Sequence, residues 1–229
     1  MEYERFALYY APPKGAALAD FGNSWLGWDA ENQREVDRPV LKGISADDIA
    51  RITTAPSRYG FHGTLKPPFR LKEGKTIAQL DSAISDLAKS LSFIVCGPLQ
   101  LKQIGRFLAL VPTNCNKALA RFAGNCVMEL DDFRAAPTEA ELVKRRKANL
   151  TARQEELLQQ WGYPYVMDEF RFHLTLTDQL EEAELSSVRK QLHGVMPHIL
   201  TSPLEIKEIC LFGDPGNGQS FHLVKRYSC

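Results

Sequence analysis

The chain has 229 residues, 44% of them hydrophobic and 24% charged, which is the balance of an ordinary globular protein. Lys and Arg together number 28, as do Asp and Glu, and this net charge of zero disfavours a long nucleic acid and excludes DNA from the expected partners. Because no apolar run approaches the roughly 20 residues that span a bilayer and the N-terminus is acidic, we expect a cytoplasmic protein that has no membrane partner.

In chain order, the first elements are an Arg-Phe strand that starts at Arg5, a turn and an alanine-rich helix. A short helix is expected from Ser45. The strand "RYGFHGTLKP" follows, and Pro67 should end it because proline cannot donate to a central ladder. A Thr-x-x-Gln capping box then opens a helix over 76–91, and "PLQLKQI", from Pro98, follows as a strand.

The same series of elements returns in the second half of the chain. "RFLALVPTNCNKALARF" from Arg106 repeats the strand, turn and helix that start at Arg5, and "PLEIKEI" from Pro203 repeats "PLQLKQI". A helix over 181–195 follows the second histidine motif, as the helix over 76–91 follows the first. The sequence therefore predicts an internal duplication.

The two halves differ in what precedes the histidine motif. Two capping boxes in the second half predict a helical hairpin, or one broken helix, over 138–161. We expect one lobe over residues 1–105 and another over 106–229, with this helical insert at about 134–161. Because similar halves usually pack about a pseudo-twofold axis, the expected fold class is α+β. Two lobes would line a central cleft with antiparallel sheets and carry their helices outside.

Two short stretches confine polar residues to one face of a strand. In "FRFHLTLT" alternate residues are apolar, and the other face carries Arg171, His173, Thr175 and Thr177. In "RYGFHGTLKP" the corresponding face carries Arg58, His62, Thr64 and Lys66. A single His-x-Thr-Leu is more often structural, but two copies at matching places in a duplicated chain predict one shared site.

The residue types in this shared site suit phosphoryl transfer. Histidine gives and takes protons near neutral pH, and a threonine two residues along points the same way, where its hydroxyl can bind a phosphate oxygen. The reaction needs positioning, charge stabilisation, and an acid and a base at the attacking and leaving oxygens. His62 and His173 can supply both proton transfers without a metal, so we expect no cofactor.

The paired His-x-Thr-Leu motifs in a duplicated α+β chain resemble the two-histidine phosphoesterase superfamily. That group includes RNA 2′,3′-cyclic phosphodiesterases and 2′-5′ RNA ligase-like proteins. "RYGFHGTLKPPFRL", "FRAAPTEAELVKRRKANLTARQEELLQQWGYPYV" and "FRFHLTLTDQL" also resemble, almost end to end, an uncharacterised bacterial family encoded near phosphonate-utilisation operons. The resemblance implies that His62 and His173 are the acid/base pair and that Thr64 and Thr175 bind phosphate.

Four further residues are candidates for substrate binding. Lys66 and Arg171 share faces with the histidines and are candidate phosphate cations. Tyr59 flanks the first motif, and Arg134 lies in an "FRAAP" turn that is unusual for a purely structural loop. One departure between the motifs is Gly63, which stands where the other motif has a large leucine. We expect it to let another backbone approach closely.

The expected function is metal-independent hydrolysis of a cyclic phosphodiester on a small ribose phosphate or nucleotide, and the resemblance suggests a place in phosphonate metabolism. One alternative is an RNA-end 2′,3′-cyclic or 2′-5′ phosphodiesterase, and a second is a module that binds a phosphate ester without turnover. A His-based metal hydrolase is disfavoured, because the sequence has no HxH, HExxH or HD spacing and its five cysteines show no CxxC. The sequence does not indicate an oligomeric state.

Overall fold

The computed structural model describes residues 2–114, 116–196 and 199–229. Their strands form one eight-stranded antiparallel sheet, in the order β10-β9-β1-β4-β7-β6-β5-β8, and a separate two-stranded hairpin. The strands of the large sheet are β1 (Arg5–Tyr10), β4 (Gly63–Phe69), β5 (Ile94–Ile104), β6 (Phe107–Pro112), β7 (Leu174–Thr175), β8 (Pro203–Ile206), β9 (Glu208–Asp214) and β10 (His222–Ser228). The hairpin consists of β2 (Trp28–Asp29) and β3 (Arg34–Glu35).

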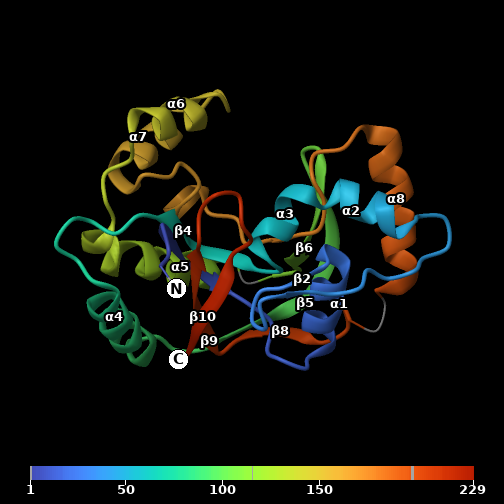
Figure 1. Cartoon of the computed structure of the whole chain (residues 1–229), viewed down its shortest axis with the longest axis horizontal. Coiled ribbons are helices and arrows are strands. Elements are labelled where there is room, and N and C mark those ends of the chain that lie inside the picture. Colours follow the sequence, from blue (N-terminus) through green and yellow to red (C-terminus); the bar gives the residue numbers. More distant parts are fainter. Residues whose placement is uncertain (1, 115, 197–198) are drawn as a thin grey trace.

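The helices form two groups: α4, α5, α6 and α7 lie on the left in Figure 1, and α1, α2, α3 and α8 lie toward the right. α4 packs near β10 and α5 near β4, whereas α8 packs on β6. The α-helices are α1 (Ala17–Leu26), α2 (Ala46–Ile52), α3 (Thr54–Tyr59), α4 (Ile77–Ser90), α5 (Asn116–Glu129), α6 (Glu139–Arg146), α7 (Ala152–Trp161) and α8 (Glu182–Val195). Two 3-10 helices are η1 (Asp131–Phe133) and η2 (Met167–Glu169). Among the described residues, no helix has the length and hydropathy that a membrane span requires.

Capping residues explain where several of these helices begin. The hydroxyls of Ser45, Thr76, Thr138 and Thr151 each accept a hydrogen bond from the backbone N–H three residues later. Each bond satisfies one of the N–H groups that a helix start leaves without a partner. The predicted helices over 76–91 and 181–195 are confirmed, and the insert over 138–161 is a helical hairpin of α6 and α7.

Each half of the sheet combines strands from both halves of the chain. β9 and β10 extend the half that contains β1 and β4, while β5 lies between β6 and β8 in the other half. The two histidine strands, β4 and β7, lie side by side and are flanked by the two Arg-Phe strands, β1 and β6, as a duplication predicts. The predicted α+β class is confirmed. Gly105 lies in the turn between β5 and β6, which pair with each other, and the lobe boundary proposed there stays a prediction.

The predicted strand ends need correction. Arg58 and Tyr59 belong to α3 rather than to the first histidine strand, and β4 continues through Pro67 to Phe69. The second histidine strand is shorter than its eight-residue alternation suggests, because only β7 enters the ladder. Thr177 is buried rather than exposed on the polar face, and its hydroxyl accepts a hydrogen bond of 3.0 Å from the backbone N–H of Leu108.

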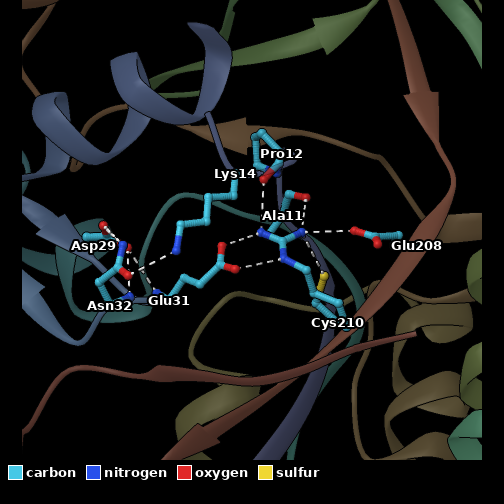
Figure 2. A network of polar contacts seen from close by, with 9 residues as sticks. Ala11, Pro12, Lys14, Asp29, Glu31, Asn32, Glu208 and Cys210 are labelled. Carbon is cyan, nitrogen blue, oxygen red and sulfur yellow. Dashed lines mark hydrogen bonds and ion pairs between the residues drawn. The ribbon is translucent and has the colours of Figure 1, made fainter. Parts of the chain in front are cut away.

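A partly buried ion-pair network fixes the hairpin to the edge of the sheet (Figure 2). The guanidinium of Arg226 pairs with Glu31 at 2.8 Å and with Glu208 at 3.2 Å. It also donates to the backbone carbonyls of Ala11 and Pro12. Arg226 lies in β10, Glu208 in β9, and Ala11 and Pro12 directly after β1. The network therefore links the end of β1 to β9 and β10.

Candidate functional site

The two histidine motifs meet at the centre of the sheet. Gly63 of β4 pairs with Leu174 of β7, and this register, extended by one residue each way, sets His62 against Thr175 and Thr64 against His173. Directly opposite residues of antiparallel strands point to the same face, with Cβ atoms about 5 Å apart. The sheet thus brings together on one face the two histidines and two threonines that the sequence predicted as one site.

Backbone carbonyls orient both imidazoles in the same way. Nδ1 of His62 donates a hydrogen bond of 2.8 Å to the carbonyl of Gly60, and Nδ1 of His173 donates one of 2.8 Å to the carbonyl of Arg171. Gly60 has a φ of 74°, a backbone conformation that glycine adopts without strain. With each Nδ1 protonated, each neutral ring keeps Nε2 as the atom that can accept or deliver a proton.

The surroundings of His62 are aromatic. Its ring stacks on that of Tyr9 with centroids 3.8 Å apart and an interplanar angle of 26°, and Phe212 and Tyr59 lie near it at 6.3 and 6.1 Å. Burial and, to a smaller degree, the charge of His173 lower the pKa of His62 from 6.5 to about 4, and the hydrogen bond to Gly60 opposes this shift. His62 is therefore neutral at physiological pH.

His173 has fewer aromatic neighbours. The ring of Phe107 lies 5.7 Å from it, centroid to centroid, at an angle of 50°. Burial lowers the pKa of His173 as well, and the hydrogen bond to Arg171 opposes that shift.

A cleft of about 280 Å³ opens beside His62. It lies between α3 and the chain that follows β7, and its lining includes Tyr59, Phe107, Thr175 and Asp178. Thr64 contacts the histidine from within the same face, with Oγ1 at 3.4 Å from Nε2 of His62. Of the four motif residues, His62 and Thr175 line this cleft and offer a ligand of modest size one proton-transfer atom and one hydroxyl. Among the described residues, no three His, Cys, Asp or Glu side chains gather as metal ligands would.

Lys66 was expected on the histidine face, and this prediction is wrong. The pairing of β1 with β4 shifts between Tyr9–Thr64 and Leu8–Lys66, so a β-bulge at Leu65 turns Lys66 to the opposite face. There its Nζ donates a hydrogen bond of 2.9 Å to the carbonyl of Val127. We therefore leave Lys66 out of the proposed site.

The role expected of Gly63 also needs correction. A Cβ atom built on Gly63 would lie 2.5 Å from the ring of Phe172. The glycine therefore makes room for an aromatic side chain of the second motif rather than for another backbone. This contact packs the two motifs against each other.

The other predicted binding residues lie apart from one another. Tyr59 lines the cleft beside His62, as expected. Arg171 is exposed and borders a separate hollow beside β5 and β6, together with Lys102. Arg134 is bound to Asp131 at 2.7 Å and lines another cavity beneath the α6–α7 hairpin.

Two residues of the site, Tyr9 and Phe107, were missed in the sequence. Tyr9 lies in β1 and Phe107 in β6, each far in sequence from the histidine that it touches. Both fall in the "Arg-Phe" strands that the duplication singles out, so the repeat itself was a signal. The alternation within each strand could not indicate which side faces the histidines.

The fold and the paired motifs define an α+β protein with a two-histidine centre. Residues 64–222 match the sequence profile of the family described as "Protein of unknown function (DUF1045)", and the chain belongs to that family. It is 39% identical over 180 residues to "Ribose 1,5-bisphosphate phosphokinase PhnN" of Janthinobacterium sp. (strain Marseille), a match that covers 79% of this chain and 40% of that protein. It is 35% identical over 222 residues to the protein of the same name from Laribacter hongkongensis (strain HLHK9), covering 96% and 51%. The chain thus spans about half the length of these curated relatives, or less.

Solved structures of similar shape include E. coli LigT. The crystal structure of LigT complexed with 3′-AMP is 15% identical and covers 99% of this chain and 98% of that one, with a TM-score of 0.44. LigT complexed with NADP+ is 13% identical and covers 100% and 98%, with a TM-score of 0.45. Both curated relatives carry the name PhnN.

Proposed function

We propose that this protein is a metal-independent phosphoesterase that opens a cyclic phosphodiester on a small ribose phosphate or nucleotide. The observation that carries the proposal is the β4–β7 register, which sets each histidine against the threonine of the other motif. With both Nδ1 atoms bonded to backbone carbonyls, His62 and His173 each keep Nε2 for proton transfer to or from a ligand.

In the proposed reaction, Nε2 of His62 takes a proton from a water molecule whose oxygen attacks phosphorus. The bond from phosphorus to one ring oxygen breaks, and Nε2 of His173, which enters the step in its protonated form, gives that oxygen a proton. Afterwards His62 releases its proton to solvent and His173 takes one up. One water is consumed, and the product is a phosphate monoester with a free hydroxyl. The hydroxyls of Thr64 and Thr175 donate to the other phosphate oxygens. His62 takes the role of base because the charge of His173 is among the causes that lower its pKa to about 4, which fits a neutral His62 beside a protonated His173.

The substrate class follows from the size of the cleft. A volume of about 280 Å³ suits a sugar phosphate or one nucleotide rather than a longer chain. The name of both relatives, with its ribose bisphosphate, supports a ribose phosphate. The resemblance to a family encoded near phosphonate-utilisation operons supports a place in phosphonate metabolism.

We assign the kinase activity in that name to the part of those proteins outside the match. The sequence of this chain contains no G-x-x-x-x-G-K-[ST] loop, which P-loop kinases use to hold nucleotide phosphates.

The test is hydrolysis of a small panel in the presence of EDTA: 2′,3′-cyclic nucleotides, ribose 1,2-cyclic phosphate and a 2′-5′ dinucleotide. We expect turnover of a cyclic compound that survives EDTA and collapses in both His62→Ala and His173→Ala. Loss of activity with EDTA would contradict the mechanism. Tight binding of a phosphate ester without any turnover would instead make the protein a binding module, and preference for the 2′-5′ dinucleotide would favour an RNA end.

A further inference from the structure

A second cavity, of about 110 Å³, lies between the end of β4 and the α6–α7 hairpin, and we call it the insert pocket. Its charge is strongly one-sided, because Glu141 is the one carboxylate among its described lining residues. The cationic side chains that line it are Arg5, Arg70, Arg134, Lys144 and Arg145.

Three of these cations already have carboxylate partners. Arg5 pairs with Asp214 at 2.5 Å and Arg134 with Asp131 at 2.7 Å. Arg70 pairs with Glu141 at 3.0 Å. These pairs hold the walls of the insert pocket in place.

Lys144 and Arg145 have no such partner. In the part of the chain that the structure describes, neither makes an ion pair, and the guanidinium of Arg145 lies over the ring of Tyr163 at 4.5 Å. The next residue on the helix, Arg146, does pair, with Glu155 at 2.7 Å. Two of the four consecutive cations of α6 and its C-cap are therefore directed to the pocket and remain without a counter-charge.

The insert pocket lies on the same face of the sheet as His62. Arg5 and Tyr9 are four residues apart on β1, so their side chains share a face and their Cα atoms are about 13 Å apart. Tyr163, beneath Arg145, lies near the cleft, since the phenol of Tyr59 contributes to raising the pKa of Tyr163. One extended small molecule can therefore reach from the histidines toward the pocket.

We propose that the insert pocket binds a phosphomonoester on the substrate, at the end away from the cyclic phosphate. Arginine and lysine around a small cavity match the charge and the several acceptor oxygens of a phosphate. The proposal deepens the proposed function, on which it rests for the identity of the substrate. The substrate would then carry two phosphate groups, one for the histidines and one for Lys144 and Arg145.

Binding is measured first, with ribose 5-phosphate as the probe and calorimetry as the readout. The host is the His62→Ala/His173→Ala double variant, so that binding at the histidines does not contribute. Adding Lys144→Gln and Arg145→Gln should weaken binding about 10- to 100-fold, because two charge-assisted hydrogen bonds are lost. The matched control is Arg146→Gln with Lys147→Gln, which removes the same charge from the same helix end and should leave the affinity within about twofold.

Turnover is measured second, on ribose 1,2-cyclic phosphate with and without a 5-phosphate. In Lys144→Gln/Arg145→Gln, the preference in kcat/KM for the 5-phosphorylated compound should fall about 10- to 100-fold, with little change for the other compound. Equal weakening by the control pair, unaltered binding in Lys144→Gln/Arg145→Gln, or no binding of ribose 5-phosphate to the host would overturn the proposal. If no cyclic compound is hydrolysed while the binding result holds, the proposed function fails and the phosphate site stands.

Discussion

The two His-x-Thr motifs share a backbone plan and differ in what lies beside each histidine. On β1, Tyr9 pairs with Thr64 and stacks on His62. On β6, the residue that pairs with Thr175 is Ala109, whose methyl side chain cannot stack on His173 as Tyr9 stacks on His62. A duplicated backbone can therefore place two identical side chains symmetrically while neighbours on adjacent strands give them different proton affinities.

This difference suits a reaction that needs an acid and a base. Two histidines in identical surroundings would titrate alike, and neither would be preferred for either role. The stacked and buried His62 has its pKa lowered to about 4, so it is available as a base. We infer that Tyr9 is the residue that breaks the symmetry of the pair.

The largest effect is expected from removing either histidine. His62→Ala and His173→Ala should each lower kcat/KM by about 10²–10⁴-fold, the usual contribution of one proton-transfer group. Because the two act in one step, the double variant should lose far less than the product of the single losses. The measurement is steady-state kinetics on the preferred cyclic compound.

The control for these variants is His193→Ala, which removes an exposed histidine on α8. It should leave kcat/KM unchanged. A similar loss in His193→Ala, or full activity in either of the other two variants, would show that the histidines are not the acid/base pair.

The next largest effect is expected from disturbing the contact between Gly63 and Phe172, which packs the two motifs together. Gly63→Ala places a methyl group 2.5 Å from the ring of Phe172 and should lower the free energy of unfolding by about 1–3 kcal/mol. Gly194→Ala is the matched change, because a Cβ there meets nothing within 4 Å. Urea denaturation of both variants tests this, and equal stability of the two would contradict the packing described.

The lowered pKa of His62 should make the free energy of unfolding depend on pH, and a His62 variant isolates this contribution from those of other groups. Its pKa is about 4 in the folded protein and 6.5 without burial, so between these values the unfolded chain binds more protons. The free energy of unfolding should therefore rise with pH from about 4 to 6.5. His62 contributes a slope of up to about 1.4 kcal/mol per pH unit. Denaturation of wild type and His62→Gln at several pH values gives that slope by difference, and parallel curves would mean that the pKa is not lowered.

The smallest effect concerns Tyr9 itself. Tyr9→Ala gives the first motif the residue that the second has at Ala109, and the loss of the covering ring should raise the pKa of His62 by about one unit. Tyr9→Phe keeps the stacked ring and should leave that pKa unchanged. NMR titration of the imidazole protons measures both variants, and a shift in His173 instead of His62 would reverse the assignment.

Local signals made much of the fold predictable. Capping boxes located α4, α6 and α7, and the repeated segments indicated the duplication. That His62 and His173 lie on one face of the sheet was also predictable, because both motifs confine the same polar residues to one face of a strand. In each case the information lies within a few consecutive residues.

Features that depend on pairing between distant strands were not predictable. The bulge at Leu65 turns Lys66 away from the histidines, yet the sequence alternates there without interruption. Likewise, the stacking of Tyr9 on His62 depends on the register of β1 against β4, which neither strand specifies alone. The insert pocket draws its cations from four separate segments, so no single motif marks it.

The exchange of strands between the halves has a consequence for how the chain folds during synthesis. β1 is made well before its partner β9, since Asp214 of β9 lies 209 residues beyond Arg5. One edge of β1 therefore stays unpaired until these 209 residues have been made, and contacts of such sequence separation form slowly. An exposed strand edge is prone to join other chains, so we expect the nascent protein to depend on chaperones more than its size suggests.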